Sequence, residues 1–144
     1  MPEGNGITSA LVFDYGLRQI GIATGNKLSG ATPRGILRAR DGQPDWEIVR
    51  QLIDEWRPDI VLVGLPLNMD GTGSELSARA RKFARRLHGR FGVAVKMVDE
   101  RLSTREAKSR VGPRDSYRED PIDDLAAQII LEGWLTDPSI AVDP

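Results

Sequence analysis

The feature that most constrains the fold is a buried strand that ends in a carboxylate. Residues 10–13, Ala-Leu-Val-Phe, form an unbroken apolar run, which is typical of a strand covered on both faces. Asp14 follows directly, and Gly16 and Arg18 lie in a short connection to a second apolar strand at 19–24. A carboxylate at the end of a buried strand is costly unless a positive charge or a ligand lies beside it. Asp14 is therefore a candidate functional residue, although Asp-x-Gly alone is equally typical of a hairpin turn.

Composition narrows the available chemistry. The 144 residues include 20 Lys and Arg against 21 Asp and Glu, so binding of nucleic acid would need a local basic patch. Cysteine is absent and His88 is the single histidine, which excludes disulfides and thiolate metal sites and argues against a His-based triad. The sequence contains neither an 18-residue apolar run nor the pattern of a signal peptide, so we expect a cytoplasmic protein without a membrane span.

The chain reads as one domain in which three antiparallel strands precede alternating helices and strands. We expect a flexible N-terminus at 1–9, the domain at 10–135 and a flexible C-terminal tail at 136–144. The expected strands are 10–14, 19–24, 34–38, 59–65 and 93–98, and the expected helices are 45–57, 75–87, a short one from Ser103, and 121–135. This order predicts an α/β fold of three layers, a mixed five-stranded sheet with helices on both faces.

Two further carboxylates are candidates, one after another strand and one at the start of a helix. Glu100 follows the strand at 93–98, and Asp123 lies in the first turn of the last helix. Acids in a first turn suit the helix dipole, but Asp123 shares the core-facing stripe of Ala127, Ile130 and Trp134, whereas Asp124 shares that of Gln128. Carboxylates without Cys or His favour hard divalent cations such as Mg²⁺ or Mn²⁺. Two such ions can stabilise the attacking water and the leaving oxygen of a phosphoryl displacement.

Two segments are candidates for contacts with a substrate. The loop at 66–74 consists of turn formers and follows a buried strand, at the sheet edge where open α/β folds bind ligands. In the second helix, six Lys or Arg lie between Arg79 and Arg90, with Arg79, Lys82 and Arg86 on one stripe. A solvated cationic face and a surface for phosphates are equally good interpretations of this stripe.

Four motifs taken together resemble the YqgF/RuvX family, relatives of the RuvC-type resolvases with a ribonuclease H-like fold. They are FDYGLRQIGIA, IVLVGLPLNMDGT, VDERLSTREA and IDDLAAQIIL, in this order along residues 11–135. The resemblance implies that Asp14, Glu100 and Asp123 are the catalytic acids and the ligands of Mg²⁺ or Mn²⁺. It also implies a metal-dependent endonuclease that processes the 5′ end of pre-16S rRNA, with Holliday junction resolution in DNA recombination as the alternative.

The resemblance extends to substrate and partners. The expected partners are nucleic acid, with pre-rRNA favoured over branched DNA, and pre-ribosomal particles, and we expect a monomer or weak dimer. The expected substrate contacts are Arg18, Asn68, Asp70, Gly71, Arg79, Lys82, Arg86, Arg101, Ser103 and Thr104.

Two other functional classes remain open. Actin-like kinases and ATPases share this fold and an Asp-x-Gly turn, but they need two such domains around the nucleotide, and 144 residues supply one. A nucleic-acid-binding module without catalysis would keep the fold, and metal-dependent cleavage that disappears in Asp14→Asn would exclude it.

The adjacent aspartates give a first testable prediction. Side chains one residue apart on a helix point about 100° apart, so Asp123 and Asp124 cannot both meet the strand ends. Asp123→Asn should remove cleavage, whereas Asp124→Asn should leave cleavage nearly intact and lower the stability by about 0.3–1 kcal/mol through the helix dipole. Cleavage assays and urea denaturation of both variants check this. The reverse pattern would make Asp124 the ligand, and loss of cleavage in both would indicate that Asp124 acts through a water.

Overall fold

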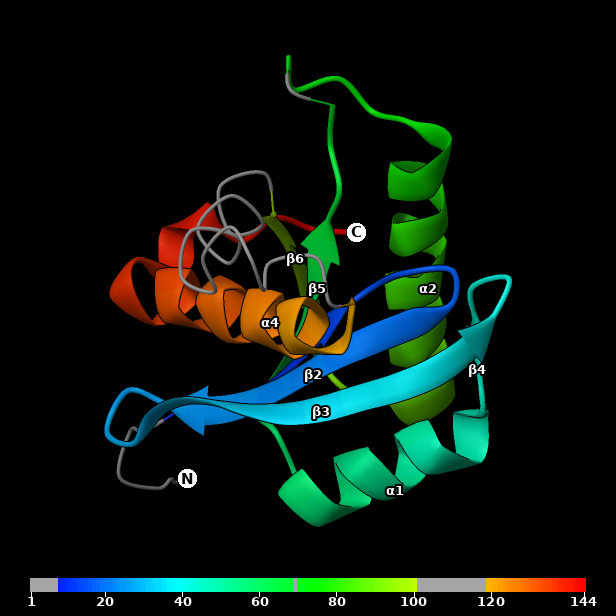
Figure 1. The fold of residues 1–144 in the computed structure, drawn as a ribbon. Coiled ribbons are helices and arrows are strands. Elements are labelled where there is room, and N and C mark those ends of the chain that lie inside the picture. The colour runs from blue at the N-terminus through cyan, green and yellow to red at the C-terminus, as the bar shows by residue number, and fades with distance from the viewer. Residues whose placement is uncertain (1–7, 69, 101–118) are drawn as a thin grey trace.

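Six strands and three α-helices make up the part of the chain that the computed structural model describes (Figure 1). It describes residues 8–68, 70–100 and 119–144, and in the last range the side chains from 125 onward. The elements are β1 (Ala10–Asp14), β2 (Gln19–Asn26), β3 (Gly30–Arg40), β4 (Gln43–Pro44), α1 (Trp46–Trp56), β5 (Ile60–Leu65), α2 (Glu75–Phe91), β6 (Val95–Asp99), α4 (Glu119–Thr136) and the 3₁₀ helix η1 (Pro138–Ile140).

The strands form one mixed sheet in the order β4-β3-β2-β1-β5-β6. Neighbours from β1 to β4 are antiparallel, whereas β1, β5 and β6 run parallel to one another. The predicted sheet of five strands is confirmed and gains a sixth, β4, which pairs with the end of β3 after a turn at Asp41 and Gly42. The three parallel strands therefore end at one edge of the sheet, where the sequence places its carboxylates.

Helices cover both faces of the sheet, as predicted. Phe13 on β1 packs with α1 and α2 through Val49 and Leu87, while its neighbour Val12 packs with α4 through Ile130. In Figure 1, α4 (orange) and α1 (green-cyan) lie on opposite sides of β2 and β3. Because side chains alternate along a strand, the faces of β1 are buried in two separate cores.

Capping residues determine where the first two helices begin and end. The predicted N-cap Asp45 accepts a hydrogen bond from Glu47 N at 3.0 Å, and α1 ends at Arg57, whose φ of 43° is left-handed. At the start of α2, Ser74 and Ser77 form a reciprocal capping box that the sequence prediction missed. The helix continues to Phe91, four residues past the predicted end, and stops at Gly92 with φ 68°.

The C-terminal segment lies along the free edge of β6, where we expected a flexible tail from the sequence. Val142 and Met97 form an antiparallel bridge with two backbone hydrogen bonds, of 2.7 and 2.8 Å. Lys96 Nζ also donates to Asp143 Oδ1 at 2.5 Å. None of the described helices is long and apolar enough to cross a membrane.

The core of the α2 layer can be tested with a matched pair of leucines. Leu87 is fully buried, whereas Leu28 is 81% exposed. Leu87→Ala should lower the free energy of unfolding by about 2–5 kcal/mol because it leaves a cavity. Leu28→Ala deletes the same atoms from a side chain that lies in solvent. It should therefore change the free energy of unfolding by less than about 0.5 kcal/mol. Urea denaturation of both variants measures the difference, and equal losses would contradict the described packing of α2.

Candidate active site

Asp14 and Glu100 meet at the edge where the three parallel strands end. Asp14 is the last residue of β1, and Glu100 follows the last residue of β6. The strand between them is β5, and Glu100 N donates to Leu65 O at the end of β5, 3.2 Å away. The parallel pairing of the strands therefore brings together two acids that are 86 positions apart in the sequence.

Both acids belong to the sheet face that α4 covers. Val12 and Val98 contact α4 in the core, and two residues further along each strand come Asp14 and Glu100. Asp99 lies between Val98 and Glu100 and is exposed. The period-two alternation of a strand thus selects Glu100 over Asp99 as the partner of Asp14.

Gly64 on β5 provides the space into which the two carboxylates converge. A Cβ at Gly64 would overlap Glu100 Oε2 and lie 3.3 Å from Asp14 Oδ1 and 3.0 Å from Ile130 Cδ1. Glu100 Oε2 is buried, and Asp14 is half-buried. The sequence prediction missed Gly64, although a lone glycine inside a buried strand signals close approach by another group.

The two described carboxylates fit a hard divalent cation. Both present oxygen ligands, and their juxtaposition over a glycine concentrates negative charge that a cation would neutralise. Among the described side chains, no group of three acids or imidazoles gathers in one place. Asp123, the predicted third ligand, lies in α4, but its side chain is outside the described residues.

The rest of α4 bears on the choice between Asp123 and Asp124. Ile130, which lies over Gly64, is seven residues after Asp123, so the two positions share a helix face. The stripe of Asp124 also contacts the sheet, since Leu131 is fully buried and Gln128 donates to Ala31 O at 3.1 Å. The stripe of Asp124 is therefore less exposed to solvent than we expected. The argument for Asp123 as the third ligand now rests on Ile130, which shares its helix face and lies over Gly64.

The loop after β5 holds its shape through its own polar groups. Asn68 Nδ2 donates to Thr72 Oγ1 at 2.9 Å, and Asp70 Oδ1 accepts from Thr72 N and Oγ1 at 3.0 and 2.6 Å. Gly71 has a φ of 88°, which glycine adopts easily. These contacts give Asn68, Asp70 and Gly71 a structural role, and their predicted contact with substrate stays a prediction.

The cationic stripe of α2 lines a pocket on the opposite face of the sheet. The pocket has a volume of about 120 Å³ and is lined by Tyr15, Gly42, Gln43, Trp46, Arg79, Lys82, Phe83 and Arg86. Arg79 forms an ion pair with Asp41 at 3.1 Å, and Arg86 donates to Gln43 Oε1 at 3.1 Å. The structure thus brings Arg79, Lys82 and Arg86 together, as predicted, and adds residues of the β3–β4 turn that the sequence did not indicate.

Tyr15 connects the two faces because it directly follows Asp14. Its ring packs against Phe83, with centroids 5.0 Å apart, and its hydroxyl donates to Gly42 O at 3.2 Å. Burial raises the pKa of Tyr15 above its ordinary value, while the charge of Arg79 acts in the opposite direction. The phenol is therefore protonated at neutral pH and is available as the donor to Gly42.

Arg18 is not among the residues that line the pocket beside α2. Arg18 is exposed in the β1–β2 connection, where its carbonyl accepts from Ala39 N at 2.8 Å. Arg101, Ser103 and Thr104 are outside the described residues, as is the short helix predicted from Ser103.

Residues 8–137 match the family described as "RuvX: Holliday junction resolvase". The chain belongs to the RuvX family. A RuvX relative from Azotobacter vinelandii is 58% identical over 131 residues, which are 88% of this chain and 92% of the relative. Another, from Chromohalobacter salexigens, is 55% identical over 131 residues, covering 88% of each chain. Both relatives carry the name "Putative pre-16S rRNA nuclease".

Solved structures confirm the fold of this RuvX chain. Thermus thermophilus RuvC, in complex with a Holliday junction substrate, is similar with a TM-score of 0.55 at 15% identity, over 94% of this chain and 98% of that chain. The yeast mitochondrial Holliday junction resolvase gives a TM-score of 0.50 at 10% identity, over 88% and 77% of the two chains. The predicted ribonuclease H-like fold is therefore correct.

The space over Gly64 can be tested by filling it. Gly64→Ala should displace one or both carboxylates, because the new methyl group would occupy the position of Glu100 Oε2. In the unsubstituted protein, Mn²⁺ at a hundredfold excess over its Kd should raise the free energy of unfolding by about 2.7 kcal/mol. Gly64→Ala should lose most of this stabilisation. Thermal unfolding with and without MnCl₂ measures it.

Gly89 supplies the matched control. A Cβ at Gly89 would meet nothing within 4 Å, so Gly89→Ala should keep the full response to Mn²⁺. It should also stabilise α2 by about 0.5–1 kcal/mol, as expected for Gly→Ala within a helix. Gly64→Ala with an undiminished response would show that the carboxylates do not bind the ion at this point.

Proposed function

We propose that this RuvX chain is a metal-dependent endonuclease that hydrolyses phosphodiester bonds of nucleic acid. The observation that carries the proposal is the convergence of Asp14 and Glu100 over Gly64, at the carboxyl edge of three parallel strands. Two carboxylates in this position provide the oxygen ligands that Mg²⁺ and Mn²⁺ prefer. Membership of a family described as a resolvase, with relatives named as rRNA nucleases, supports the same class of reaction.

In this proposal Asp14, Glu100 and Asp123 are the ligands that would hold the divalent ions. Divalent ions bound there would polarise the phosphate and stabilise the attacking and leaving oxygens. Gly64 leaves room for the two acids, and Ile130 of α4 closes the site on one side. The backbone bond from Glu100 N to Leu65 O fixes Glu100 relative to β5. The site is thus positioned by strands, with a helix packed against it.

We propose pre-16S rRNA as the substrate, with cleavage at its 5′ end, in the cytoplasm and on pre-ribosomal particles. The names of the relatives from Azotobacter and Chromohalobacter support this choice. Holliday junction cleavage is the second candidate, favoured by the description of the family and by the similarity to RuvC bound to a junction. We expect the chain to be a monomer or weak dimer, which favours the first candidate.

Single amide variants test the catalytic proposal. Asp14→Asn, Glu100→Gln and Asp123→Asn should each abolish hydrolysis, because each removes a ligand charge from a site of three carboxylates. Without metal, the variants should be as stable as the natural protein or more stable, since like charges repel one another. The assay incubates purified protein with labelled pre-rRNA ends and with a synthetic four-way junction, in parallel, with Mg²⁺ and with Mn²⁺.

The same assay separates the candidate functions. Cleavage of pre-rRNA but not of the junction supports the first candidate, and the opposite result supports the second. Full activity in Glu100→Gln would reject the metal site as proposed. Binding of both substrates with no metal-dependent cleavage would make the chain a nucleic-acid-binding module.

A further inference from the structure

The pocket between α2 and the β3–β4 turn has the composition of an anion site. Arg79, Lys82 and Arg86 contribute three positive charges from successive turns of one helix. Within the part of the chain that the structure describes, Asp41 is the one carboxylate in an ion pair with any of the three. Its own side chain is 79% exposed, whereas that of Arg79 is 29% exposed. The lining therefore carries an excess of positive charge.

Two of these cations are held in place before any ligand binds. Arg79 donates to the side chain of Asp41 at 3.1 Å and to its carbonyl at 2.5 Å. Arg86 donates to Gln43 Oε1, a neutral partner that leaves its charge uncancelled. Since a guanidinium has five N–H donors, both arginines retain donors beyond these bonds. Fixing them in advance reduces the entropy that a bound anion would otherwise have to overcome.

The β3–β4 turn, which contacts both arginines, is itself held by the residue that follows β1. Tyr15, the residue after Asp14, donates its hydroxyl to Gly42 O. Gly42 leaves no room for a side chain, because a Cβ there would overlap the Tyr15 hydroxyl and lie 3.3 Å from Arg79 Nη2. The pocket is therefore a built part of the fold, formed by three segments that are distant in sequence.

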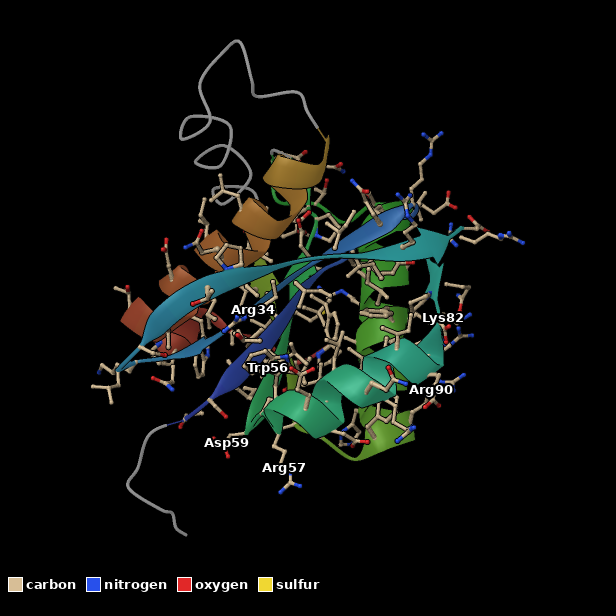
Figure 2. All side chains as sticks on the ribbon, turned by 60° about the horizontal axis from the view of Figure 1, so that its bottom comes forward. Arg34, Trp56, Arg57, Asp59, Lys82 and Arg90 are labelled. Atoms are coloured by element: carbon tan, nitrogen blue, oxygen red, sulfur yellow. The ribbon has the colours of Figure 1, made fainter. Side chains whose placement is uncertain are left out.

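Size and aromatic contacts limit what the pocket can hold. Its volume of about 120 Å³ is somewhat below the roughly 150 Å³ of a cavity that holds benzene, so one phosphate group fits and a whole nucleotide does not. Trp46 already stacks under Arg90, 4.4 Å from its ring centroid, and packs against Phe83 and Phe91. Figure 2 shows Lys82 and Arg90 near one end of α1, with Arg57 at the other. Since Trp46 is occupied in this way, the site favours a phosphate over a stacked base.

We infer that this pocket binds a backbone phosphate of the nucleic-acid strand that is cleaved on the opposite face of the sheet. The inference rests on the proposed function and adds a second phosphate subsite to it. Asp14 faces the cleavage site and Tyr15 faces the pocket, so the two sites flank the end of β1. A strand held at both sites passes over the end of β1, and the pocket fixes how far along the strand the cut falls.

The test compares two cations of α2 that differ in one respect. Lys82 and Arg85 are both exposed on the helix, but Lys82 lines the pocket and Arg85 does not. Binding of a short single-stranded RNA is measured by fluorescence anisotropy in EDTA, so that no cleavage takes place. Lys82→Ala should weaken binding at least about tenfold, because a hydrogen bond to a charged group contributes about 1.5–3 kcal/mol and each 1.4 kcal/mol is a factor of ten. It should also reduce the log–log salt slope by about 0.7, the value for one phosphate of a single strand.

Arg85→Ala should leave both the affinity and the salt slope unchanged. With Mg²⁺ present, Lys82→Ala should raise KM while kcat stays the same. Equal effects of the two variants would overturn the inference, since the helix would then act as a diffuse cationic face. No effect of Lys82→Ala would overturn it as well.

Two smaller probes distinguish the source of the phosphate. Inorganic phosphate and adenosine 5′-monophosphate are titrated while the indole N–H signal of Trp46 is followed by NMR. Weak binding of both, with much tighter binding of the RNA, supports a subsite for a strand. Binding of either one as tight as that of the RNA would overturn the inference and make the pocket a site for a free phosphate compound. Failure of Asp14→Asn to abolish cleavage would reject the proposed catalytic site, and the binding results in EDTA would be unaffected.

Discussion

The close approach of two carboxylates at a buried sheet edge is the constraint on which the rest of the structure depends. Asp14 and Glu100 converge over Gly64, and one oxygen of Glu100 is buried. Like charges this close repel one another, and removing them from water adds a further cost. The arrangement is fixed by β1, β5 and β6, whose hydrogen bonds hold the acids in position. A divalent cation bound between the two acids, as proposed, would offset this repulsion.

Because side chains alternate along a strand, Asp14 and Tyr15 at the end of β1 face opposite sides of the sheet. Asp14 lies on the α4 face beside Glu100, and Tyr15 lies on the α1–α2 face against Phe83. Tyr15 in turn holds Gly42, and the turn at Asp41 holds Arg79. A displacement of the end of β1 would therefore move both the carboxylate and the cationic pocket. The backbone of Asp14 and Tyr15 thus links the positions of the two groups of side chains.

The sequence predicted those parts of the molecule that depend on local pattern. The apolar run before Asp14 and the N-cap at Asp45 follow from periodicity and capping, and the structure has them. Two local signals were overlooked. Gly64 interrupts a buried strand, and Asp41-Gly42, with φ of 50° and 78°, is a two-residue turn that creates β4.

Other features could not be predicted from local pattern at all. The ion pair of Arg79 with Asp41 joins residues 38 positions apart, and it forms because α2 packs beside the β3–β4 turn. From the sequence, the stripe of Arg79, Lys82 and Arg86 was equally consistent with a solvated face. The same limit applies to Asp124, whose stripe contains the fully buried Leu131 because α4 packs across β1, β2 and β3 and buries a wide face. Helical periodicity predicts which side chains share a helix face. Whether that face contacts the sheet or solvent depends on how the helix packs.

The position of the pocket relative to the acids also bears on the form of the nucleic acid. One strand that fills both sites must bend over the end of β1, because the acids and the pocket lie on opposite faces of the sheet. Duplex DNA has a persistence length of about 50 nm, so a continuous duplex resists such a turn, whereas a single strand makes it at little cost. Phosphate contacts of this kind carry no sequence information, and the stacked Trp46 is not free to read a base. Selectivity would then come from the local flexibility of the substrate, which an unpaired end of precursor rRNA and the branch point of a junction both provide.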